Sequence, residues 1–366
     1  MQITPRIINW NNNRQLWCSD QNKLTCLALG SGDTKKLILI HGRTGFMSII
    51  LAGGAGFIGS KLAAHFLRQG PVLILDNFCR GRKEFLDGCP GQGQLTVVQV
   101  DIANVDHTQE VIANFHKKHP VDTVWHMAAN SDIPAGIADA NVDLHDTFMT
   151  TFSLLEAMKK QGIGNLAFAS SSAIYGDFGP GTKLHENIGP LLPISNYGAM
   201  KLASEAIISA ATEAWLERAW IFRFPNVVGT PATHGVMLDF VRKLKATPSQ
   251  LTVLGNGTQQ KAYLHVDDLV DAMLFITRHA DGKINIYNIG PDDDGCSVRF
   301  IAEAAVARVQ PGARIIYGSE PRGWVGDVPK FSYSIDKLAA LGWKSPPSSQ
   351  QAVIKAMNEI AMQEGV

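Results

Sequence analysis

Residues 51–60 read Leu51-Ala52-Gly53-Gly54-Ala55-Gly56-Phe57-Ile58-Gly59-Ser60. The apolar run Ile49-Ile50-Leu51 comes directly before the glycines and a helical pattern follows them, so they lie between a strand and a helix. Glycines at this spacing permit a tight turn, close approach of the backbone to a phosphate, and close packing of the helix on the strand. The free N–H groups at the helix start favour an anion. The stretch therefore predicts a strand–loop–helix unit whose loop binds a pyrophosphate.

Outward from this unit, short apolar runs alternate with longer helical ones as far as residue 225. Strands are predicted at residues 48–51, 72–75, 95–100, 123–127, 166–170 and 220–224. Helices are predicted at residues 60–69, 108–117, 144–160 and 199–216. Continuous apolar strands that alternate with helices indicate a parallel sheet covered on both faces. We therefore predict an α/β protein with a doubly wound parallel Rossmann sheet over residues 47–225.

The two ends of the chain follow different patterns. After residue 226 the alternation loosens, with helices predicted at residues 235–244, 266–278, 298–309 and 350–363. We expect residues 226–366 to form mainly a smaller α+β C-terminal domain that binds substrate, with some segments returning to the Rossmann domain. Residues 1–46 contain turn-like segments and one predicted strand, at residues 37–40. They are predicted to be an N-terminal extension, on the hypothesis that the working protein begins near Met47.

Composition excludes several classes of protein. The chain has 366 residues, of which 45% are hydrophobic and 18% charged, and its formal net charge is zero. This balance is typical of a globular protein and gives no overall electrostatic signal for nucleic acid or an anionic membrane. The five cysteines are odd in number and lack metal-ligand spacing, so no metal site is predicted. Without a secretory signal or an apolar stretch of roughly 20 residues, we expect a cytoplasmic protein.

The second predicted strand ends in Asp76, about 20 residues after the glycines. A carboxylate there accepts hydrogen bonds from the adenosine ribose and repels a 2′-phosphate, so NAD is preferred to NADP, although Arg80 lies nearby. The ends of the third and fourth strands are expected to border the same ligand. The predicted cofactor-binding residues are Gly53, Gly56, Phe57, Ile58, Gly59, Asp76, Asn77, Asp101, Ile102, Met127, Ala128, Ala129, Tyr197 and Lys201.

A candidate catalytic group comes from two separate segments. Tyr197 and Lys201 are four residues apart near the start of a predicted helix, so both lie on one face. A lysine charge beside a phenol lowers the phenol's pKa from roughly 10 and suits it to move a proton. Ser171 follows the fifth strand, at the sheet edge where α/β proteins bind ligands. Taken singly, these segments also fit a surface helix pair and a plain turn.

With these motifs the sequence resembles an extended short-chain dehydrogenase/reductase of the NAD-dependent nucleotide-sugar epimerase/dehydratase family, from about Met47 to the last helix. Further matches are Asp76-Asn77, Asp101-Ile102, His126 to Ala129, Ser170 to Gly176, Arg223 to Gly229, Tyr263 to Asp268, Tyr287 to Gly290 and Leu341 to Trp343. The resemblance implies that Tyr197 is the acid/base, that Lys201 holds the nicotinamide ribose, and that Ser171 shares the proton of the sugar hydroxyl. It also implies that Asn226, Lys261 and Arg322 bind the substrate, a nucleotide-diphosphate sugar.

The reaction implied by the resemblance is epimerisation at C4 of a sugar of the UDP-glucose/UDP-galactose type, through a transient 4-keto intermediate. Sugar 4,6-dehydratases of this group carry Asp-Glu as acid and base, whereas here Ser172-Ala173 follow Ser171. The alternatives are another nucleotide-sugar activity, such as a 4-keto reductase or a 4,6-dehydratase, and a non-catalytic NAD(P)-binding sensor. Sensors of this superfamily commonly lose the Tyr/Lys pair, which is present here.

Some positions depart from the family pattern. Thr147 stands where the family often has asparagine, and Lys261 and Trp324 stand where UDP-sugar epimerases usually have two arginines. Arg322, two residues earlier, is predicted to compensate for the second. Homodimers are usual for the group, and here the helices at residues 144–160 and 199–216 would form the interface. Phe148, Phe152 and Leu155 recur there at helical spacing, which also fits core packing.

Overall fold

A computed structural model of the chain describes residues 48–179, 182–320 and 332–366, and four short strands before residue 48. The chain divides into two compact units, Met1–Met47 and Ser48–Val366. In the first unit, two antiparallel pairs form. They are β1 (Ile7–Trp10) with β2 (Arg14–Trp17), and β3 (Leu24–Cys26) with β4 (Ile40–Gly42).

The prediction of a single strand before residue 46 was therefore wrong. Three further strands form, and the predicted one lies at Ile40–Gly42, while residues 37–39 lie outside the described residues. Each strand has only three or four residues. Runs of that length are too short for a period of two to be distinguished from chance.

The second unit is built on a seven-stranded sheet in which every strand is parallel to its neighbours. Its strands are β5 (Ser48–Ala52), β6 (Val72–Asp76), β7 (Leu95–Gln99), β8 (Val121–His126), β9 (Asn165–Ala169), β11 (Arg218–Arg223) and β16 (Ile284–Asn288). Their order across the sheet is β16-β11-β9-β8-β5-β6-β7. The first six strands thus have the Rossmann order, which reverses between β5 and β8. The predicted fold class is confirmed, and β16 adds a seventh strand from the C-terminal part of the chain.

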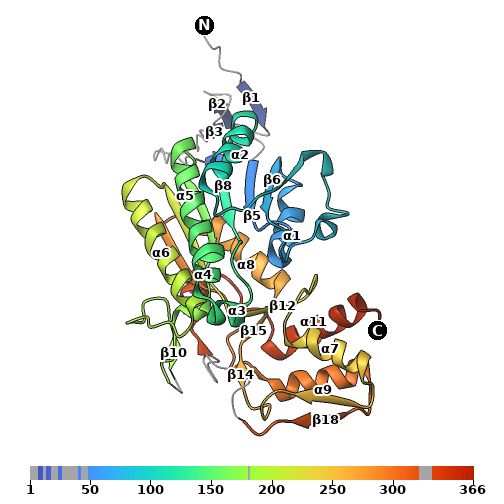
Figure 1. Ribbon diagram of the computed structural model, residues 1–366. Helices are drawn as coiled ribbons and strands as arrows, with labels where there is room; N and C mark the ends of the chain where they lie inside the picture. The colour runs from blue at the N-terminus through green and yellow to red at the C-terminus, as the bar shows by residue number, and fades with distance from the viewer. Residues whose placement is uncertain are drawn as a thin grey trace. The chain divides into compact units, whose positions relative to one another are not determined.

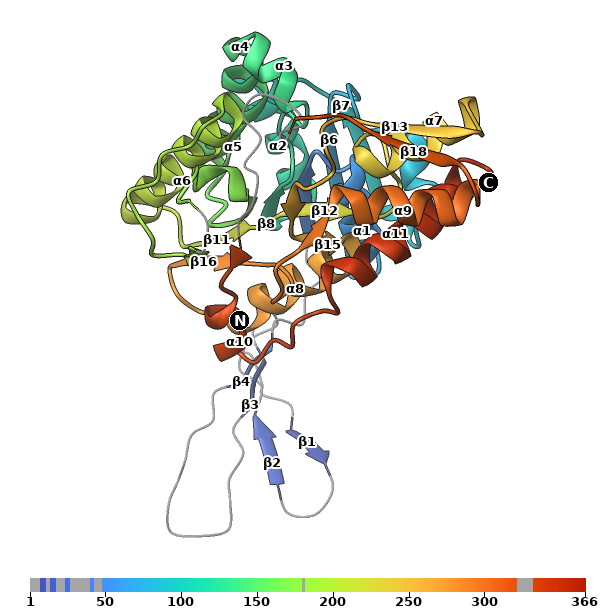
Figure 2. The same ribbon diagram turned by 90° about the horizontal axis from the view of Figure 1, so that it is seen from below.

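Two apolar cores cover the two faces of this sheet, as the alternation along β5 requires. Ile49 and Leu51 join the core formed with helices α1 (Phe57–Phe66) and α8 (Val266–His279). Ile50 and Ala52 join the core formed with α2 (Val105–Lys118), α5 (Thr150–Gln161) and α6 (Asn196–Ala214). Helices therefore pack on both faces of the sheet, as Figures 1 and 2 show.

The helix predicted at residues 144–160 is two pieces, the π-helical turn η3 (Leu144–Met149) and α5, and the short helix α4 (Ala140–Asp143) precedes them. At the junction, the hydroxyls of Thr150 and Thr151 donate to the carbonyl of Thr147, at 3.0 and 3.2 Å. Such side-chain bonds compete with the regular backbone ladder. Apolar periodicity does not separate a π turn from an α turn, so the sequence could not show this break.

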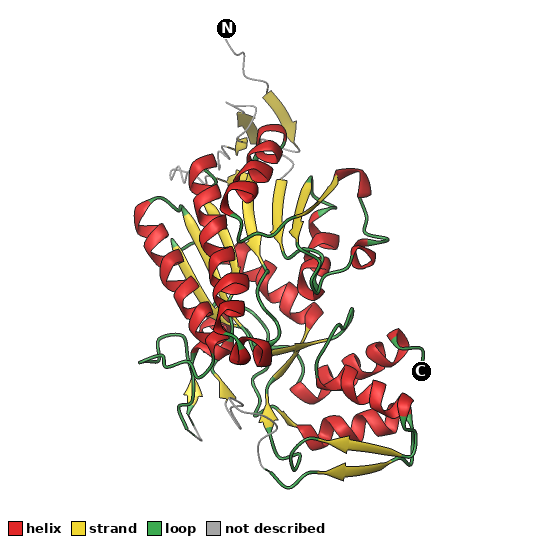
Figure 3. Ribbon diagram, in the orientation of Figure 1, coloured by secondary structure: helices red, strands yellow, loops and turns green. Residues whose placement is uncertain are grey.

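Three helices and several short strands form a smaller part at the C-terminal end of the chain, drawn at the lower right of Figure 3. Helices α7 (Val236–Ala246), α9 (Val298–Val309) and α11 (Ser349–Gln363) share a third apolar core. Short paired strands accompany them: β12 (Asn226–Val228) with β15 (Tyr263–His265), β13 (Gln250–Val253) with β18 (Arg314–Tyr317), and β14 (Gln260–Lys261) with β17 (Cys296–Ser297). A separate pair, β10 (Lys183–Leu184) with β19 (Ser332–Tyr333), belongs to a fourth apolar cluster. Among the described residues, no helix has the length and apolar character that a membrane span requires.

The other short helices lie in the connections. They are η1 (Lys83–Leu86), η2 (Gln92–Gln94), α3 (Ile133–Ala138), η4 (Ser172–Ile174) and α10 (Asp336–Ala340). Two of them, α3 and η4, follow strands of the central sheet and border the site described next.

Candidate active site

A cavity of about 960 Å³ lies at the carboxyl ends of the central strands, where the sheet order reverses. Its volume is at the upper end of the range typical of ligand sites. Most of the predicted site residues line it. They are Gly53, Gly56, Phe57, Ile58, Gly59, Asp76, Asn77, Asp101, Ile102, Met127, Ala128, Ala129, Ser171, Tyr197, Asn226 and Lys261.

The glycine loop has the geometry that its sequence predicts. Gly53 adopts φ +75°, and a Cβ there would lie 2.7 Å from the backbone nitrogen of Ala128. A Cβ on Gly59 would lie 2.2 Å from the carbonyl oxygen of Gly53. Gly56 precedes α1 and provides no side-chain cap. The first N–H groups of this helix therefore have no capping side chain from Gly56, and the loop backbone is open to a phosphate.

Asp76 lines the cavity beside the glycine loop. Its Oδ2 accepts from the backbone N–H of Ala55 at 3.0 Å, and its Oδ1 accepts from that of Phe78 at 2.9 Å. Burial raises the pKa of this carboxyl, and the two backbone N–H groups oppose that rise. Gly81 packs against it, because a Cβ there would meet both carboxylate oxygens at 2.9 Å. The carboxylate is thus held in place with further acceptor capacity for ribose hydroxyls.

The neighbouring polar residues are held by their own loops. The side chain of Asn77 accepts from the backbone N–H of Cys79 at 3.0 Å. Asp101 accepts from the N–H of Ala103 at 3.0 Å, and its other oxygen lies 3.3 Å from Nε2 of His145. These contacts orient the walls where an adenine is expected.

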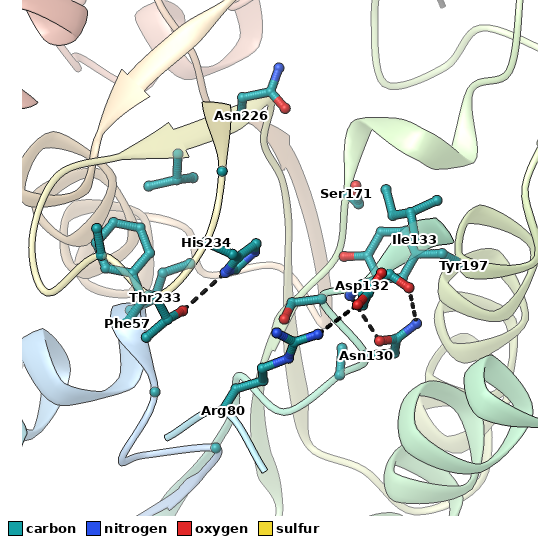
Figure 4. A pocket seen from close by; sticks show the side chains of 18 of the residues that line it. Phe57, Arg80, Asn130, Asp132, Ile133, Ser171, Tyr197, Asn226, Thr233 and His234 are labelled. Carbon is teal, nitrogen blue, oxygen red and sulfur yellow. Dashed lines mark hydrogen bonds and ion pairs between the residues drawn. The ribbon is translucent and has the colours of Figure 1, made fainter. Parts of the chain in front are cut away.

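Ser171 and Tyr197 meet on one side of the cavity, although they come from different elements (Figure 4). Ser171 follows β9 and caps η4, where its Oγ accepts from the N–H of Ala173 at 3.1 Å. Ser195 caps α6 in the same way, and Tyr197 lies in the first turn of that helix. A side-chain hydrogen bond between Ser171 and Tyr197 acts to lower the pKa of the Tyr197 phenol.

Lys201 has a different environment from the one predicted. Its Nζ donates to the carbonyl of Ala169 at 2.6 Å and lies 5.9 Å from the centre of the Tyr197 ring. The side chain is 1% exposed and does not line the cavity. Burial lowers the pKa of Lys201 to about 7, against the charges of Glu205 and Asp143.

The pKa of Tyr197 differs from the prediction that Lys201 lowers it towards neutrality. Burial raises the pKa of Tyr197 to about 12, and the charge of Asp143 adds to the rise, while Ser171 opposes it. The reason is that desolvation of the phenol exceeds these local interactions.

A buried charge network beside the pair was not predicted. Tyr197, Lys201 and Glu205 recur every four residues along α6, and Glu205 accepts from Arg223 at 3.0 and 2.6 Å. Ser170 donates to the same carboxylate at 2.5 Å. Although burial opposes it, hydrogen bonding to Glu205 raises the pKa of Arg223 above its usual range. The spacing of Glu205 from Lys201 was the signal in the sequence that could have pointed to it.

The C-terminal part of the chain forms another wall of the cavity. Asn226, at the start of β12, is exposed there, and Lys261 of β14 also lines the wall. Arg322 and Trp324 lie outside the described residues. His234, just before α7, was not among the predicted site residues but lines the cavity opposite Tyr197 (Figure 4).

An ion pair between two loops was also missed. Arg80, after β6, places its Nη2 2.7 Å from Oδ2 of Asp132, after β8. Both line the cavity, and Asn130 bonds to the backbone of Asp132 in both directions (Figure 4). Arg80 is thereby engaged by a carboxylate on the opposite loop.

Comparison with known proteins identifies the family of this chain. A family model described as "NAD dependent epimerase/dehydratase family" matches residues 49–290. The chain belongs to this family. A UDP-glucose 4-epimerase of Lacticaseibacillus casei is 30% identical over 319 residues, which is 81% of this chain and 92% of that protein.

Two solved structures also resemble this family member. One, described as a UDP-galactose 4-epimerase, is 30% identical and has a TM-score of 0.72 over 87% of this chain and 99% of its own. Another, the UDP-glucose 4-epimerase of Thermus thermophilus in complex with NAD, is 25% identical and has a TM-score of 0.73 over 87% of this chain and 100% of its own. The resemblance predicted from the motifs is confirmed.

The residues of this family member fit its cofactor, NAD. The glycine loop offers backbone N–H groups without side chains in the way, and the buried Asp76 carboxylate stands where a ribose would bind. Close packing of Gly53 on Ala128 keeps the loop against the strand end. The chain is therefore an NAD-dependent enzyme of this family.

Proposed function

We propose that the enzyme epimerises a nucleotide-diphosphate sugar at C4, with Tyr197 as the acid/base. The observation that carries the proposal is the meeting of Ser171 and Tyr197 in one cavity with the glycine loop and Asp76. No carboxylate pair follows Ser171, which argues against water elimination. The names of the 30%-identical relatives, a UDP-glucose 4-epimerase and a UDP-galactose 4-epimerase, support a UDP-hexose as substrate.

In the proposed reaction Tyr197 removes the proton of the 4-hydroxyl and later returns it. Bound NAD supplies the acceptor and donor of the C4 hydride. Ser171 hydrogen-bonds the same oxygen and shares its proton, which lowers the barrier to transfer. The 4-keto sugar turns over between the two half-reactions, so that its opposite face meets the hydride donor. Atoms balance because the proton and hydride removed from the sugar both return to it.

The proposed role of Tyr197 as a base requires that its pKa fall from the value that burial sets. Burial raises the pKa of Tyr197 to about 12. Positive charge in the loaded site favours the phenolate, and Lys201 lies 5.9 Å from the ring centre.

The substrate is proposed to lie between this pair and the C-terminal part of the chain. Asn226 and Lys261 line that end of the cavity, and a lysine suits a diphosphate as a point charge. Arg322 stays a prediction as a third ligand. Residues 226–366 are accordingly proposed as mainly the substrate-binding domain, although β16 of this segment belongs to the central sheet.

A homodimer through α5 and α6 is part of the proposal. Of the three residues at helical spacing, Leu155 is buried in the core, Phe148 is half-buried and Phe152 is 40% exposed. Leu144, one turn before Phe148, is 44% exposed. An apolar strip along η3 and α5 supports an interface there. Light scattering on the purified chain tests it: a mass of two chains is expected, and a mass of one chain would refute it.

Incubation of the purified protein with UDP-glucose, UDP-galactose and their N-acetyl and uronic acid analogues, without added cofactor, tests the activity. The proposal predicts formation of a C4 epimer and release of NAD when the protein is denatured. A reaction that needs NAD(P)H in each turnover would indicate a 4-keto reductase. Loss of water would indicate a dehydratase, and binding of NAD without turnover of any nucleotide sugar would indicate a sensor.

A further inference from the structure

The ion pair between Arg80 and Asp132 joins the two flanks of the crevice that holds the glycine loop. Arg80 lies in the loop after β6 and Asp132 in the loop after β8, and Nη2 of the arginine lies 2.7 Å from Oδ2 of the aspartate. Strand β5 lies between β6 and β8 in the sheet, and the glycine loop follows it. Because adjacent strands are about 4.8 Å apart, the two loops start about 10 Å apart, one on each side of the glycine loop. Both residues line the same cavity as the glycines (Figure 4).

The aspartate end of this bridge is fixed by its own loop. Asn130 donates from Nδ2 to the carbonyl of Asp132 at 2.9 Å and accepts from its N–H at 2.8 Å. Asn130 is buried, and its own N–H donates to the hydroxyl of Thr147 at 3.1 Å. The other carboxylate oxygen of Asp132 accepts from the N–H of Ala135 at 3.1 Å and caps α3. The Oδ2 atom is therefore presented to Arg80 from a fixed position.

The backbone at the arginine end is fixed to the glycine loop. The N–H of Arg82 donates to the carbonyl of Ala55 at 3.1 Å. Gly81 packs closely on the same residue, because a Cβ there would lie 2.9 Å from the carbonyl carbon of Ala55. The Arg80 side chain itself is 46% exposed. With the backbone held on both flanks, the bridge can open by rotation of this one long side chain.

We propose that the Arg80–Asp132 pair is a strap across the cofactor crevice, which has to open for NAD to leave. A dinucleotide that lies along the glycine loop, with a ribose at Asp76, lies between the two flanks that the pair joins. This role concerns the cofactor alone and does not depend on which nucleotide sugar is turned over. Retention would suit an enzyme that regenerates its NAD in each turnover.

The exposure of the pair limits the size of the effect. The two side chains are 46% and 38% exposed, so water screens their attraction. Loss of a pair of this kind changes an equilibrium by up to about five-fold. When the strap has to open before release, its loss is therefore expected to raise the rate of NAD release about five-fold.

Exchange of labelled NAD into the loaded protein measures this release. The purified protein is saturated with NAD and mixed with an excess of radiolabelled NAD, and the label held by the protein is followed over time. The double variant Arg80→Gln/Asp132→Asn lacks the ion pair but leaves the net charge of the cavity unchanged, so the attraction for the diphosphate is preserved. Asparagine also keeps an acceptor oxygen for the cap of α3. Exchange about five-fold faster than in the native protein is expected, and an unchanged rate would overturn the proposal.

The single variants separate a strap from direct binding of NAD by Arg80. A strap predicts that Arg80→Gln and Asp132→Asn both speed exchange, and that the double variant is no faster than the faster of the two. If Arg80 instead binds the diphosphate by itself, Asp132→Asn frees the guanidinium and removes a negative charge, so exchange slows. Slower exchange in Asp132→Asn, or additive effects of the two substitutions, would overturn the strap.

A second ion pair provides a matched control. Nζ of Lys183 lies 3.1 Å from Oδ1 of Asp292, the side chains are 48% and 54% exposed, and neither residue lines the cavity. Lys183→Gln should therefore exchange NAD at the native rate. Equally fast exchange in Lys183→Gln and in the double variant would mean that any lost surface pair loosens NAD, and would refute a strap at Arg80.

The exchange assay and the assay of turnover fail independently. If no nucleotide sugar is turned over, the proposed function fails, while the exchange rates of the variants still decide the role of Arg80 and Asp132. If the double variant exchanges NAD at the native rate, the strap is refuted, while formation of a C4 epimer by the native protein still supports the proposed function.

Discussion

Replacement of Glu205 by glutamine tests the buried charge network that supports the catalytic helix. The glutamine keeps the shape of the side chain but places an NH₂ group where one carboxylate oxygen receives Arg223 Nη2 at 2.6 Å. The guanidinium then faces a donor and loses its counter-charge at a side chain that is 4% exposed. Breaking a buried pair by removing one partner costs about 3–5 kcal/mol.

The chain carries a matched control on its surface. Arg242 donates to both oxygens of Glu364, at 3.2 and 3.0 Å, so the pair has the same two-point geometry as the buried one. Here the arginine side chain is 56% exposed. Exposed pairs are worth about 0–1 kcal/mol, because water solvates the partner that remains. Glu364→Gln therefore removes an equivalent contact without burying a charge.

Urea and thermal unfolding of the two variants measure the difference. With a shift of about 2 °C for each kcal/mol in a chain of this size, Glu205→Gln is expected to lower Tm by about 6–10 °C. Glu364→Gln should lower it by less than about 2 °C. Equal, small shifts in both variants would refute the reasoning, since they would mean that water reaches Arg223 or that its charge is balanced elsewhere.

Three further outcomes are expected. Tyr197→Phe should lower kcat about 10²–10⁴-fold with little change in KM, measured as formation of the C4 epimer; unchanged turnover would remove the acid/base role. Gly59→Ala should abolish the retention of NAD, measured as the NAD released when the purified protein is denatured, because the new Cβ would lie 2.2 Å from the Gly53 carbonyl oxygen. In the control Gly93→Ala the new Cβ meets nothing within 4 Å, so this variant should retain NAD. Burial lowers the pKa of Lys201 from 10.5 to about 7, so on raising the pH the native state releases this proton before the unfolded chain does. The free energy of unfolding of the native protein, measured in urea relative to that of Lys201→Met, should therefore rise between pH 7 and 10.5. A difference that does not change with pH would contradict the burial of this lysine.

The sequence was sufficient for the parts of the site that short segments determine. The glycine loop and Asp76 belong to one βαβ unit, so their spacing alone predicts a shared pocket, and both line the cavity. Ser171 and Tyr197 could also be placed together, because the end of a parallel strand and the start of a following helix meet at the same edge of the sheet. Their positions follow from topology, which alternating apolar segments specify well.

Other parts depend on packing between distant segments. Arg80 and Asp132 are paired across 52 residues, and nothing in either loop indicates the other. Strand β16 joins the sheet from the C-terminal part through hydrogen bonds to β11. The pKa of Tyr197 was predicted in the wrong direction because the prediction counted the nearby lysine and not the burial of the phenol. Burial is a property of the assembled fold, so a single motif does not reveal it.

The most direct measurement uses UDP-glucose labelled with deuterium at C4, incubated with the purified protein and no added cofactor. If C4 is oxidised and reduced again within one site, the UDP-galactose formed carries the deuterium at C4 and none appears in the solvent. Product with protium at C4, or recovery of the labelled substrate unchanged under conditions in which NAD is bound, would contradict the account.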